Sequence, residues 1–274
     1  MIPAILLLIL IMCYLLALRG RRGHPGLEEL KKWRYAHRGL YGGSIPENSM
    51  EAFRQAFDRG FGIEFDLHLL KDGNIAISHD SDLKRMTGED RILETLSTED
   101  LHHFHLRGTQ WEIPTFREVL DLCCGRVPLI IELKSYRGNA DQLTAAACRM
   151  LEGYDGPYCL ESFDPRCVRW LKLNRPEIVR GQLSENFLKN KSLPIAAFLR
   201  FLASCQLETF WTSPDFIAHR YEERKTLGNF LIRKLWKVQG VTWTVRSEQA
   251  LLQAEKEGWI PIFEGFLPED PHTK

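Results

Sequence analysis

Short apolar runs alternate with amphipathic segments along most of this 274-residue chain. The apolar runs are rich in β-branched and aromatic residues, which favours strands. The predicted strands are, in chain order, 34–38, 62–70, 127–134, 158–163, 178–183, 209–213, 241–245 and 259–264. Between them, helical spacing of apolar residues predicts helices such as 49–59, 115–123, 140–151, 165–173 and 248–256. Strands that alternate with helices in this way predict an α/β fold, the (β/α)₈ TIM barrel.

The segment that follows the second predicted strand is too long for a simple loop. It contains another extended run, 74–78, and short stretches with helical spacing. We interpret residues 74–111 as a small insertion on the barrel, and we place the barrel domain at 34–270.

The first residues of the chain form an uninterrupted apolar segment. Residues 2–18 carry no charge, which is close to the minimum length for a membrane-spanning helix, and Arg19, Arg21 and Arg22 follow at once. A secretory signal peptide has its positive charges before the apolar run and small residues after it, so it is the weaker alternative. We therefore predict a transmembrane helix over 1–19 and a juxtamembrane linker over 20–33. The positive-inside rule then predicts a single-pass protein of the cell membrane with a cytoplasmic barrel.

Composition narrows the classes of function. The 36 basic and 36 acidic side chains cancel, so the chain lacks the overall positive charge typical of nucleic-acid binding, and we expect no nucleic-acid partner. The seven cysteines are odd in number and form no CxxC pair. This pattern favours reduced thiols in the core over a disulfide framework or a thiolate metal site.

Histidines and charged residues lie near the ends of several predicted strands, where the working residues of a TIM barrel are found. The group is His37, Arg38, Glu64, Asp66, His79, Glu132 and Lys134. Residues i and i+2 of a strand share a face, so Glu64 and Asp66 point together. With Glu132 from another strand they predict an oxygen-rich site for a divalent cation, Mg²⁺ or Ca²⁺.

Each of these residues also has a purely structural interpretation. Glu64 and Asp66 fit a solvated strand edge, and Glu132 with Lys134 fits an ion pair. His37 fits a core histidine whose hydrogen bonds are satisfied, and His79-Asp80 fits a turn cap. His68 shares the face of Glu64 and Asp66, which allows a peripheral role. The polar insertion holds a further group that we interpret as a solvated or substrate-proximal loop: His102, His103 and His105.

Seven short motifs occur in one order along the chain. They are His37-Arg38-Gly39, Pro46-Glu47-Asn48-Ser49, Glu64-Phe65-Asp66, His79-Asp80, Ile131-Glu132-Leu133-Lys134, Ser162-Phe163-Asp164 and Trp243-Thr244-Val245. Together they resemble the glycerophosphodiester phosphodiesterase family, over about 34–268.

The resemblance implies an activity and a role for each site residue. The activity is metal-dependent hydrolysis of glycerophosphodiesters to glycerol 3-phosphate and an alcohol, through a cyclic phosphate formed by the neighbouring glycerol hydroxyl. The implied roles are acid and base for His37 and His79, metal ligands for Glu64, Asp66 and Glu132, phosphate contacts for Arg38 and Lys134, orientation of a catalytic neighbour for Glu47, and the walls of the site mouth for Phe163 and Trp243.

Two positions depart from the family pattern, and both concern the leaving group. Arg246 stands where the family usually has asparagine, and Glu264 lies in a last strand whose Thr-Asp-x-Pro pattern is altered. Lysophospholipase D activity on lysophospholipids is an alternative, supported by the predicted membrane helix and by Phe163, Trp243 and the aromatic-rich region 198–211, which could contact an acyl chain. A catalytically silent membrane protein that binds a phosphoester is the other alternative.

Overall fold

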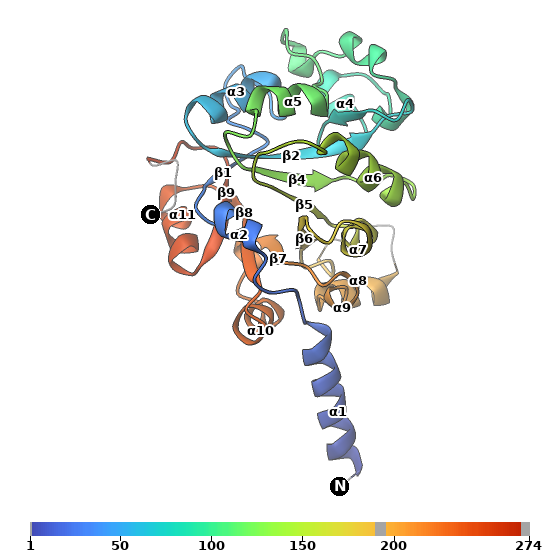
Figure 1. Cartoon of the computed structure of the whole chain (residues 1–274), viewed down its shortest axis with the longest axis vertical. Coiled ribbons are helices and arrows are strands. Elements are labelled where there is room, and N and C mark those ends of the chain that lie inside the picture. Colours follow the sequence, from blue (N-terminus) through green and yellow to red (C-terminus); the bar gives the residue numbers. More distant parts are fainter. Residues whose placement is uncertain (1, 190–195, 270–274) are drawn as a thin grey trace.

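A computed structural model describes residues 2–189 and 196–269 of the chain (Figure 1). Parallel strands form a closed sheet in the order β1-β9-β8-β7-β6-β5-β4-β2, and β1 pairs with β2 to complete the barrel. The barrel strands are β1 (Tyr35–His37), β2 (Gly62–Leu69), β4 (Leu129–Leu133), β5 (Tyr158–Ser162), β6 (Val179–Ser184), β7 (Phe216–Arg220), β8 (Gln239–Val245) and β9 (Trp259–Phe263). This arrangement confirms the predicted eight-stranded parallel barrel with flanking helices.

Helices cover the outside of the barrel. Those that follow a barrel strand or flank it are α3 (Met50–Asp58), α5 (Phe116–Cys123), α6 (Ala140–Met150), α7 (Pro165–Asn174), α8 (Ala197–Ser204), α9 (Thr209–Thr212), α10 (Leu227–Leu235) and α11 (Glu248–Lys256), with the short turn η4 (Tyr221–Glu223) before α10. Side-chain caps set several helix starts: Ser49 accepts a hydrogen bond from the backbone N–H of Ala52, and Thr115 forms a capping box with Glu118. The five predicted helical segments are confirmed.

The sixth predicted strand, 209–213, is wrong. These residues form the helix α9, and the strand follows at Phe216–Arg220. Threonine, phenylalanine and tryptophan favour a strand locally, but Phe210 and Trp211 are exposed here. The residues from Phe216 to His219 are all buried, as the wall of a parallel barrel requires.

A short helix closes one end of the barrel. Part of the predicted linker, Pro25–Leu30, forms α2, with Pro25 in its first turn. Leu27 and Leu30 of this helix pack in one buried cluster with Tyr35 and Phe216, which come from strands β1 and β7. The Tyr35 hydroxyl also donates a 2.8 Å hydrogen bond to the Leu30 carbonyl. The barrel core therefore includes residues upstream of its first strand.

We expect the Leu30→Ala variant to lower the free energy of unfolding by about 2–4 kcal/mol, because it leaves a cavity beside the barrel interior. Leu30 is 1% exposed. Leu252 on α11 is 51% exposed, so Leu252→Ala serves as the matched control and should change stability by under about 0.5 kcal/mol. Urea unfolding measures both. Equal effects in the two variants would contradict the packing of α2 against the barrel.

The insertion after β2 has its own small core. It contains β3 (Ile75–Ile77), antiparallel to β2, then α4 (Lys84–Thr87) and the short turns η1 (Leu93–Thr95), η2 (Glu99–His103) and η3 (Leu106–Gly108). Its buried cluster includes Leu83, Met86, Leu93 and Phe104. This segment places His79 at the pocket formed by the barrel.

The N-terminal helix α1 (Ile2–Ala17) projects from one end of the molecule, on the side of α9 and α10 (Figure 1). Within residues 2–189 and 196–269, no helix is long and apolar enough to cross a membrane. The predicted transmembrane span over 1–19 is therefore not supported: α1 has 16 residues, and a span needs about 20. Residue 270, the predicted end of the barrel domain, lies outside the described residues.

Candidate active site

The carboxyl ends of the barrel strands surround a pocket of about 650 Å³. This volume is in the usual range for small-molecule sites. Nine of the ten site residues predicted from the sequence line it: His37, Arg38, Glu47, Glu64, His79, Glu132, Lys134, Phe163 and Trp243. The tenth, Asp66, is 1% exposed and belongs to the same acidic cluster as Glu64 and Glu132. The structure thus brings together residues that are up to about 200 positions apart.

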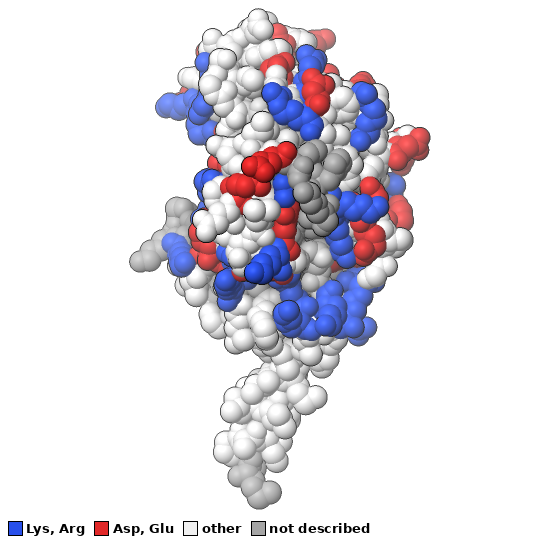
Figure 2. Space-filling model, turned by 90° about the vertical axis from the view of Figure 1, so that its left-hand side faces the viewer, with Lys and Arg blue, Asp and Glu red and all other residues white. Residues whose placement is uncertain are grey.

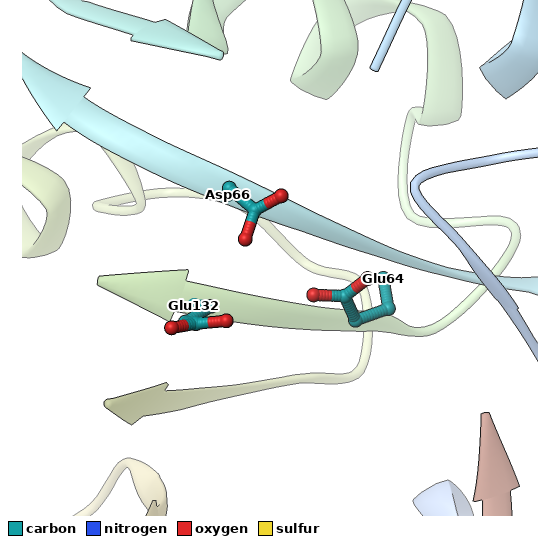
Figure 3. Close-up of side chains that lie close together, drawn as sticks. All are labelled: Glu64, Asp66 and Glu132. Atoms are coloured by element: carbon teal, nitrogen blue, oxygen red, sulfur yellow. The ribbon is translucent and has the colours of Figure 1, made fainter. Parts of the chain in front are cut away.

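Three acids on two neighbouring strands form the centre of the site (Figure 3). Glu64 and Asp66 belong to β2, and Glu132 belongs to β4, where it is the register partner of Asp66. One carboxylate oxygen of each lies within 4.8 Å of the other two, and all three residues are buried. Alternation along β2 and parallel pairing with β4 are sufficient to produce this cluster.

Burial and mutual repulsion disturb the protonation of these acids. Burial raises the pKa of Glu64 well above its usual range, and the charges of Asp66 and Glu132 raise it further. Burial also raises the pKa of Glu132 to about 7, although Lys134 opposes the effect. For Asp66, burial is outweighed by Lys134 and Arg38, and its pKa is lowered. Burial and the neighbouring acids therefore disfavour a negative charge on Glu64 and Glu132.

This donor set fits a hard divalent cation. Three carboxylates without a thiolate or imidazole in their group are the ligands that Mg²⁺ and Ca²⁺ prefer. A cation at this position would stabilise the charged form of Glu64, which burial and the neighbouring acids disfavour. Over the described part of the chain, no other group of acids, histidines or cysteines comes together in a comparable way.

The loop after β1 presents Arg38 to the acids through an unusual backbone. Arg38 has φ 54° and Gly39 has φ 80°, the left-handed region that side chains other than glycine rarely adopt. This turn directs the Arg38 N–H to Glu64 at 3.1 Å. A Cβ on Gly39 would lie 2.7 Å from the backbone carbon of Ala52 in α3, so the close approach of loop and helix also requires glycine.

Asp66 is held by three polar groups. Lys134 Nζ lies 3.1 Å from Asp66 Oδ1 and 2.7 Å from Glu132 Oε1, so the lysine bridges the two strands. Asn48 Nδ2 donates a 2.8 Å hydrogen bond to Asp66 Oδ2, and Arg38 Nε lies 3.6 Å from the same oxygen. Asn48 is a site residue that the sequence analysis missed, because it marks the start of a helix in that context.

His37 is paired with a carboxylate from the last strand of the barrel. Its Nδ1 lies 2.5 Å from Oε2 of Glu264, which follows β9, and its Nε2 lies 3.9 Å from Glu64. Because a carboxylate only accepts, Nδ1 is the donor and Nε2 faces the acidic cluster. Burial lowers the pKa of His37, although the bond to Glu264 opposes this. The hydrogen bond from His37 lowers the pKa of Glu264 to about 2.

His79 has the same kind of support from a separate network. Its Nδ1 lies 2.7 Å from Oδ1 of Asp80, and Oδ2 of Asp80 accepts a 2.5 Å hydrogen bond from Arg85. Arg85 also donates to Glu47 at 2.7 Å, and Glu47 accepts from Arg38 at the same distance. Glu47 therefore links the loop that carries Arg38 to the insertion that carries His79. Both histidines thus use Nδ1 for a carboxylate and keep Nε2 available.

Aromatic and charged side chains form the outer wall of the pocket. Phe163 and Trp243 meet edge to face with ring centroids 5.7 Å apart. The Arg220 guanidinium lies 5.4 Å from the Trp243 ring centroid and 3.2 Å from a carboxylate oxygen of Glu185. Glu161 on β5 also lines the pocket, beside Glu132.

Several polar residues of the site were not assigned from the sequence. The missed groups are Asn48, Asp80 as a histidine partner, Arg85 and Glu161. Glu264 was associated with the leaving group and not with His37.

Two other histidines named from the sequence lie away from the acidic cluster. His68 is buried against Glu94, with Nδ1 2.7 Å from Oε1, and does not line the pocket. His102 is exposed and pairs with Glu112 at 2.7 Å. The structure places neither in the acidic cluster.

We expect the Glu264→Gln variant to move the acidic limb of the pH–kcat/KM profile to lower pH. The carboxylate raises the pKa of His37 and removing it allows the histidine to lose its proton more easily, so neutral His37 persists to lower pH. We also expect kcat to fall, because the ring loses its orientation. Arg246, 3.1 Å from Glu264 and 61% exposed, supplies the control variant Arg246→Gln. An acidic limb that moves upward in Glu264→Gln would contradict the pairing.

The hydrogen-bonded pair of His37 and Glu264 also contributes to the stability of the folded chain. The pKa of Glu264 is lowered in the folded chain, so its contribution is present above about pH 4.5 and is lost as the pH falls toward about 2. The difference in unfolding free energy between wild type and Glu264→Gln should therefore shrink over that range. Urea unfolding at several pH values measures it.

Comparison with known proteins places this site in a family. The profile of the Glycerophosphoryl diester phosphodiesterase family matches residues 37–263. A Bacillus altitudinis protein named glycerophosphodiester phosphodiesterase is 36% identical over 107 residues, which cover 36% of this chain and 43% of that protein. A rat protein named lysophospholipase D GDPD1 is 31% identical over 126 residues, 39% of this chain and 40% of that protein. The matches thus span less than half the length of these two relatives.

Solved structures share the fold over nearly the whole chain. A phosphodiesterase of Oleispira antarctica, solved in complex with the product sn-glycerol-3-phosphate, superimposes with a TM-score of 0.70 at 22% identity, covering 89% of this chain and 95% of that one. At this identity the likeness concerns the fold. The family profile covers most of the chain and begins at His37, the first residue of the site. The chain therefore belongs to the glycerophosphoryl diester phosphodiesterase family.

Proposed function

We propose that this chain hydrolyses glycerophosphodiesters to glycerol 3-phosphate and an alcohol, with a divalent cation and the two histidines as acid and base. One observation carries the proposal. Two histidines, each oriented by a carboxylate, face the same pocket as a trio of buried acids and the cations Arg38 and Lys134. Phosphoryl transfer depends mainly on positioning and on stabilising negative charge, and this set of residues supplies both.

His37 is the proposed general base. Its pKa is lowered by burial, so the ring is neutral at pH 7 and Nε2 can accept a proton. The proton comes from the attacking hydroxyl, either of the substrate glycerol or of water. Glu264 then stabilises the imidazolium that forms, because its carboxylate already holds Nδ1–H.

His79 is the proposed general acid. Its side chain is 34% exposed, against 12% for His37, so it lies nearer the mouth where an alcohol can leave. Nε2 donates a proton to the leaving oxygen while Asp80 holds Nδ1. Arg38 and Lys134 bind the phosphoryl oxygens. Glu64, Asp66 and Glu132 would hold a divalent cation, which would supply positive charge to stabilise the phosphoryl group.

A lysophospholipid substrate is the second candidate. The pocket wall contains the apolar side chains Phe163, Leu183 and Trp243, which can contact an acyl chain. The name of the rat relative points the same way. The location of the chain at the cell membrane, with a cytoplasmic barrel, is a prediction from the charge distribution alone.

The test is an assay of the full chain with glycerophosphocholine and with lysophosphatidylcholine, each with EDTA, Mg²⁺ or Ca²⁺. Choline release measures turnover of both substrates. We expect metal-dependent release with the higher kcat/KM on glycerophosphocholine. Release only from lysophosphatidylcholine would favour the second candidate, and no release from either would favour a binding protein.

The Phe163→Ala variant separates the two substrates further. If the aromatic wall binds an acyl chain, the variant should lower kcat/KM for lysophosphatidylcholine about tenfold, because a large apolar contact is lost. On our proposal, the losses for the two substrates should agree within about threefold, since Phe163 then contacts only the common part. Leu252→Ala, at a 51% exposed position on α11 and outside the pocket, is the control.

A further inference from the structure

One end of the molecule exposes an unusual amount of apolar surface. Every residue of α1 from Ile5 to Met12 is between 47% and 59% exposed, so the helix is apolar and uncovered on all sides. A helix that is hydrophobic all round belongs in an apolar medium, whereas a helix that packs on one protein partner needs only an apolar stripe. The surroundings that fit α1 are therefore lipid chains, which can contact every side at once.

The last turn of α1 is firmly attached to the barrel. Leu18, which directly follows α1, is fully buried against Ile217, Ile232 and Val238. Tyr14 donates a 3.3 Å hydrogen bond to the carbonyl of Cys205, and Trp236 Nε1 donates a 2.7 Å bond to the Leu15 carbonyl. These contacts fix the direction in which the apolar helix leaves the body. The helices α9 and α10 lie on either side of the point where it leaves (Figure 1).

The helices around the point where α1 leaves the body also expose large apolar side chains. The group is Phe198, Leu199 and Phe201 on α8, Phe210 and Trp211 on α9, and Leu227, Phe230 and Leu235 on α10. Phe210 and Leu227 are 71% and 70% exposed. Together with α1 they form what we call the apolar base. Exposed apolar patches of this extent mark interaction surfaces, and aromatic residues are enriched where proteins meet the lipid–water boundary.

Positive charge accompanies the apolar base. Residues 1–27 and 224–247 contain no acid. Lys and Arg side chains gather just above the point where α1 leaves the body (Figure 2). Four exposed cations lie just after α1 or in and after the last turn of α10: Arg19, Arg22, Lys234 and Lys237. We call these four cations the cationic collar. Their positive charge is complementary to the anionic phosphates of a lipid surface.

We propose that the apolar base docks the chain on an anionic lipid bilayer, with α1 in the lipid, the aromatic side chains of α8–α10 at the boundary and the cationic collar against the phosphates. In this proposal α1 enters the lipid without crossing it, and the α8–α10 surface supplies a second contact with the bilayer. It also fixes the orientation of the barrel relative to the bilayer, because the last turn of α1 is packed against the body.

The experiment uses the full chain, purified in detergent and reconstituted with vesicles of phosphatidylcholine alone or mixed with phosphatidylglycerol, then floated through a density gradient. We expect the wild type to float with both vesicles. The double variant Leu8→Asp/Met12→Asp should bind weakly, with a preference for the anionic vesicles that decreases with salt. Adding Phe210→Asp/Phe230→Asp to it should lower the remaining binding about tenfold or more. Adding Lys234→Glu/Lys237→Glu instead should remove the anionic preference.

Matched changes away from the apolar base serve as controls. Leu252→Asp on α11 and Lys84→Glu in the insertion, both at exposed positions, should leave flotation unchanged in the same background. Thermal unfolding checks that each variant is folded, and flotation does not depend on the proposed catalysis. The proposal is overturned if the α9/α10 variants float like their parent. It is also overturned if the wild type stays with the aqueous fractions as cross-linkable dimers, since a second copy would then cover the base.

Discussion

The His37→Gln variant should lose about three orders of magnitude in kcat on glycerophosphocholine, because a positioned general base contributes about 10²–10⁴ to such a rate. Glutamine keeps much of the polar shape but cannot accept a proton from the attacking hydroxyl at Nε2. We expect KM to change much less than kcat, since the cations that bind the phosphoryl group remain. Choline release under saturating substrate and metal measures the loss.

His79→Gln should cause a loss of similar size, and the double variant should lose little more than either single variant, because the two histidines act in one proton-transfer sequence. His102→Gln, at a side chain that is 72% exposed and outside the pocket, is the matched control and should retain full activity. Residual activity of His37→Gln within a few-fold of wild type would remove this histidine from the mechanism.

Removing one acid of the central trio should abolish the response of the chain to divalent cations. We expect saturating Mg²⁺ or Ca²⁺ to raise the wild-type Tm by on the order of 5 °C, as binding to the folded state alone would do at about 100 times Kd. In Glu64→Gln this shift should disappear together with turnover. Without metal the variant should be as stable as wild type or more stable, because repulsion among three buried acids is relieved. Differential scanning calorimetry with EDTA and with metal measures the shift.

A glutamate outside the acidic cluster serves as the control for the metal-induced thermal shift. Glu112 is about 41% exposed at its side chain and pairs with His102, so Glu112→Gln should keep both the thermal shift and the activity. A metal-induced shift that survives in Glu64→Gln would mean that the cation binds elsewhere.

The acidic centre of the site could be predicted because local rules generate it. Glu64 and Asp66 are two residues apart on one strand and must share a face. Glu132 joins them once β4 pairs in parallel with β2 in the observed register. His37 and Lys134 follow from the same rule that places functional residues at the carboxyl ends of barrel strands. Most of the predicted site therefore followed from the alternation of side chains along each strand and from the order of the strands in the barrel.

The polar partners of the histidines could not be predicted in this way. His37 and Glu264 are 227 positions apart, and only closure of the barrel between β1 and β9 brings them together. Arg85 meets Glu47 because the insertion folds back over the barrel rim. No local pattern states which of the 36 acidic side chains a given histidine will contact. The helix α9 shows a related limit, since its strand-like composition is overridden by its place outside the barrel.

The most direct test of the proposed chemistry is a ³¹P NMR time course of glycerophosphocholine with the full chain, with Mg²⁺ or Ca²⁺ and then with excess EDTA. We expect the phosphodiester signal to be replaced by that of glycerol 3-phosphate, EDTA to stop the conversion and His37→Gln not to perform it. Appearance of phosphocholine instead of glycerol 3-phosphate, or conversion that continues in EDTA, would contradict the account.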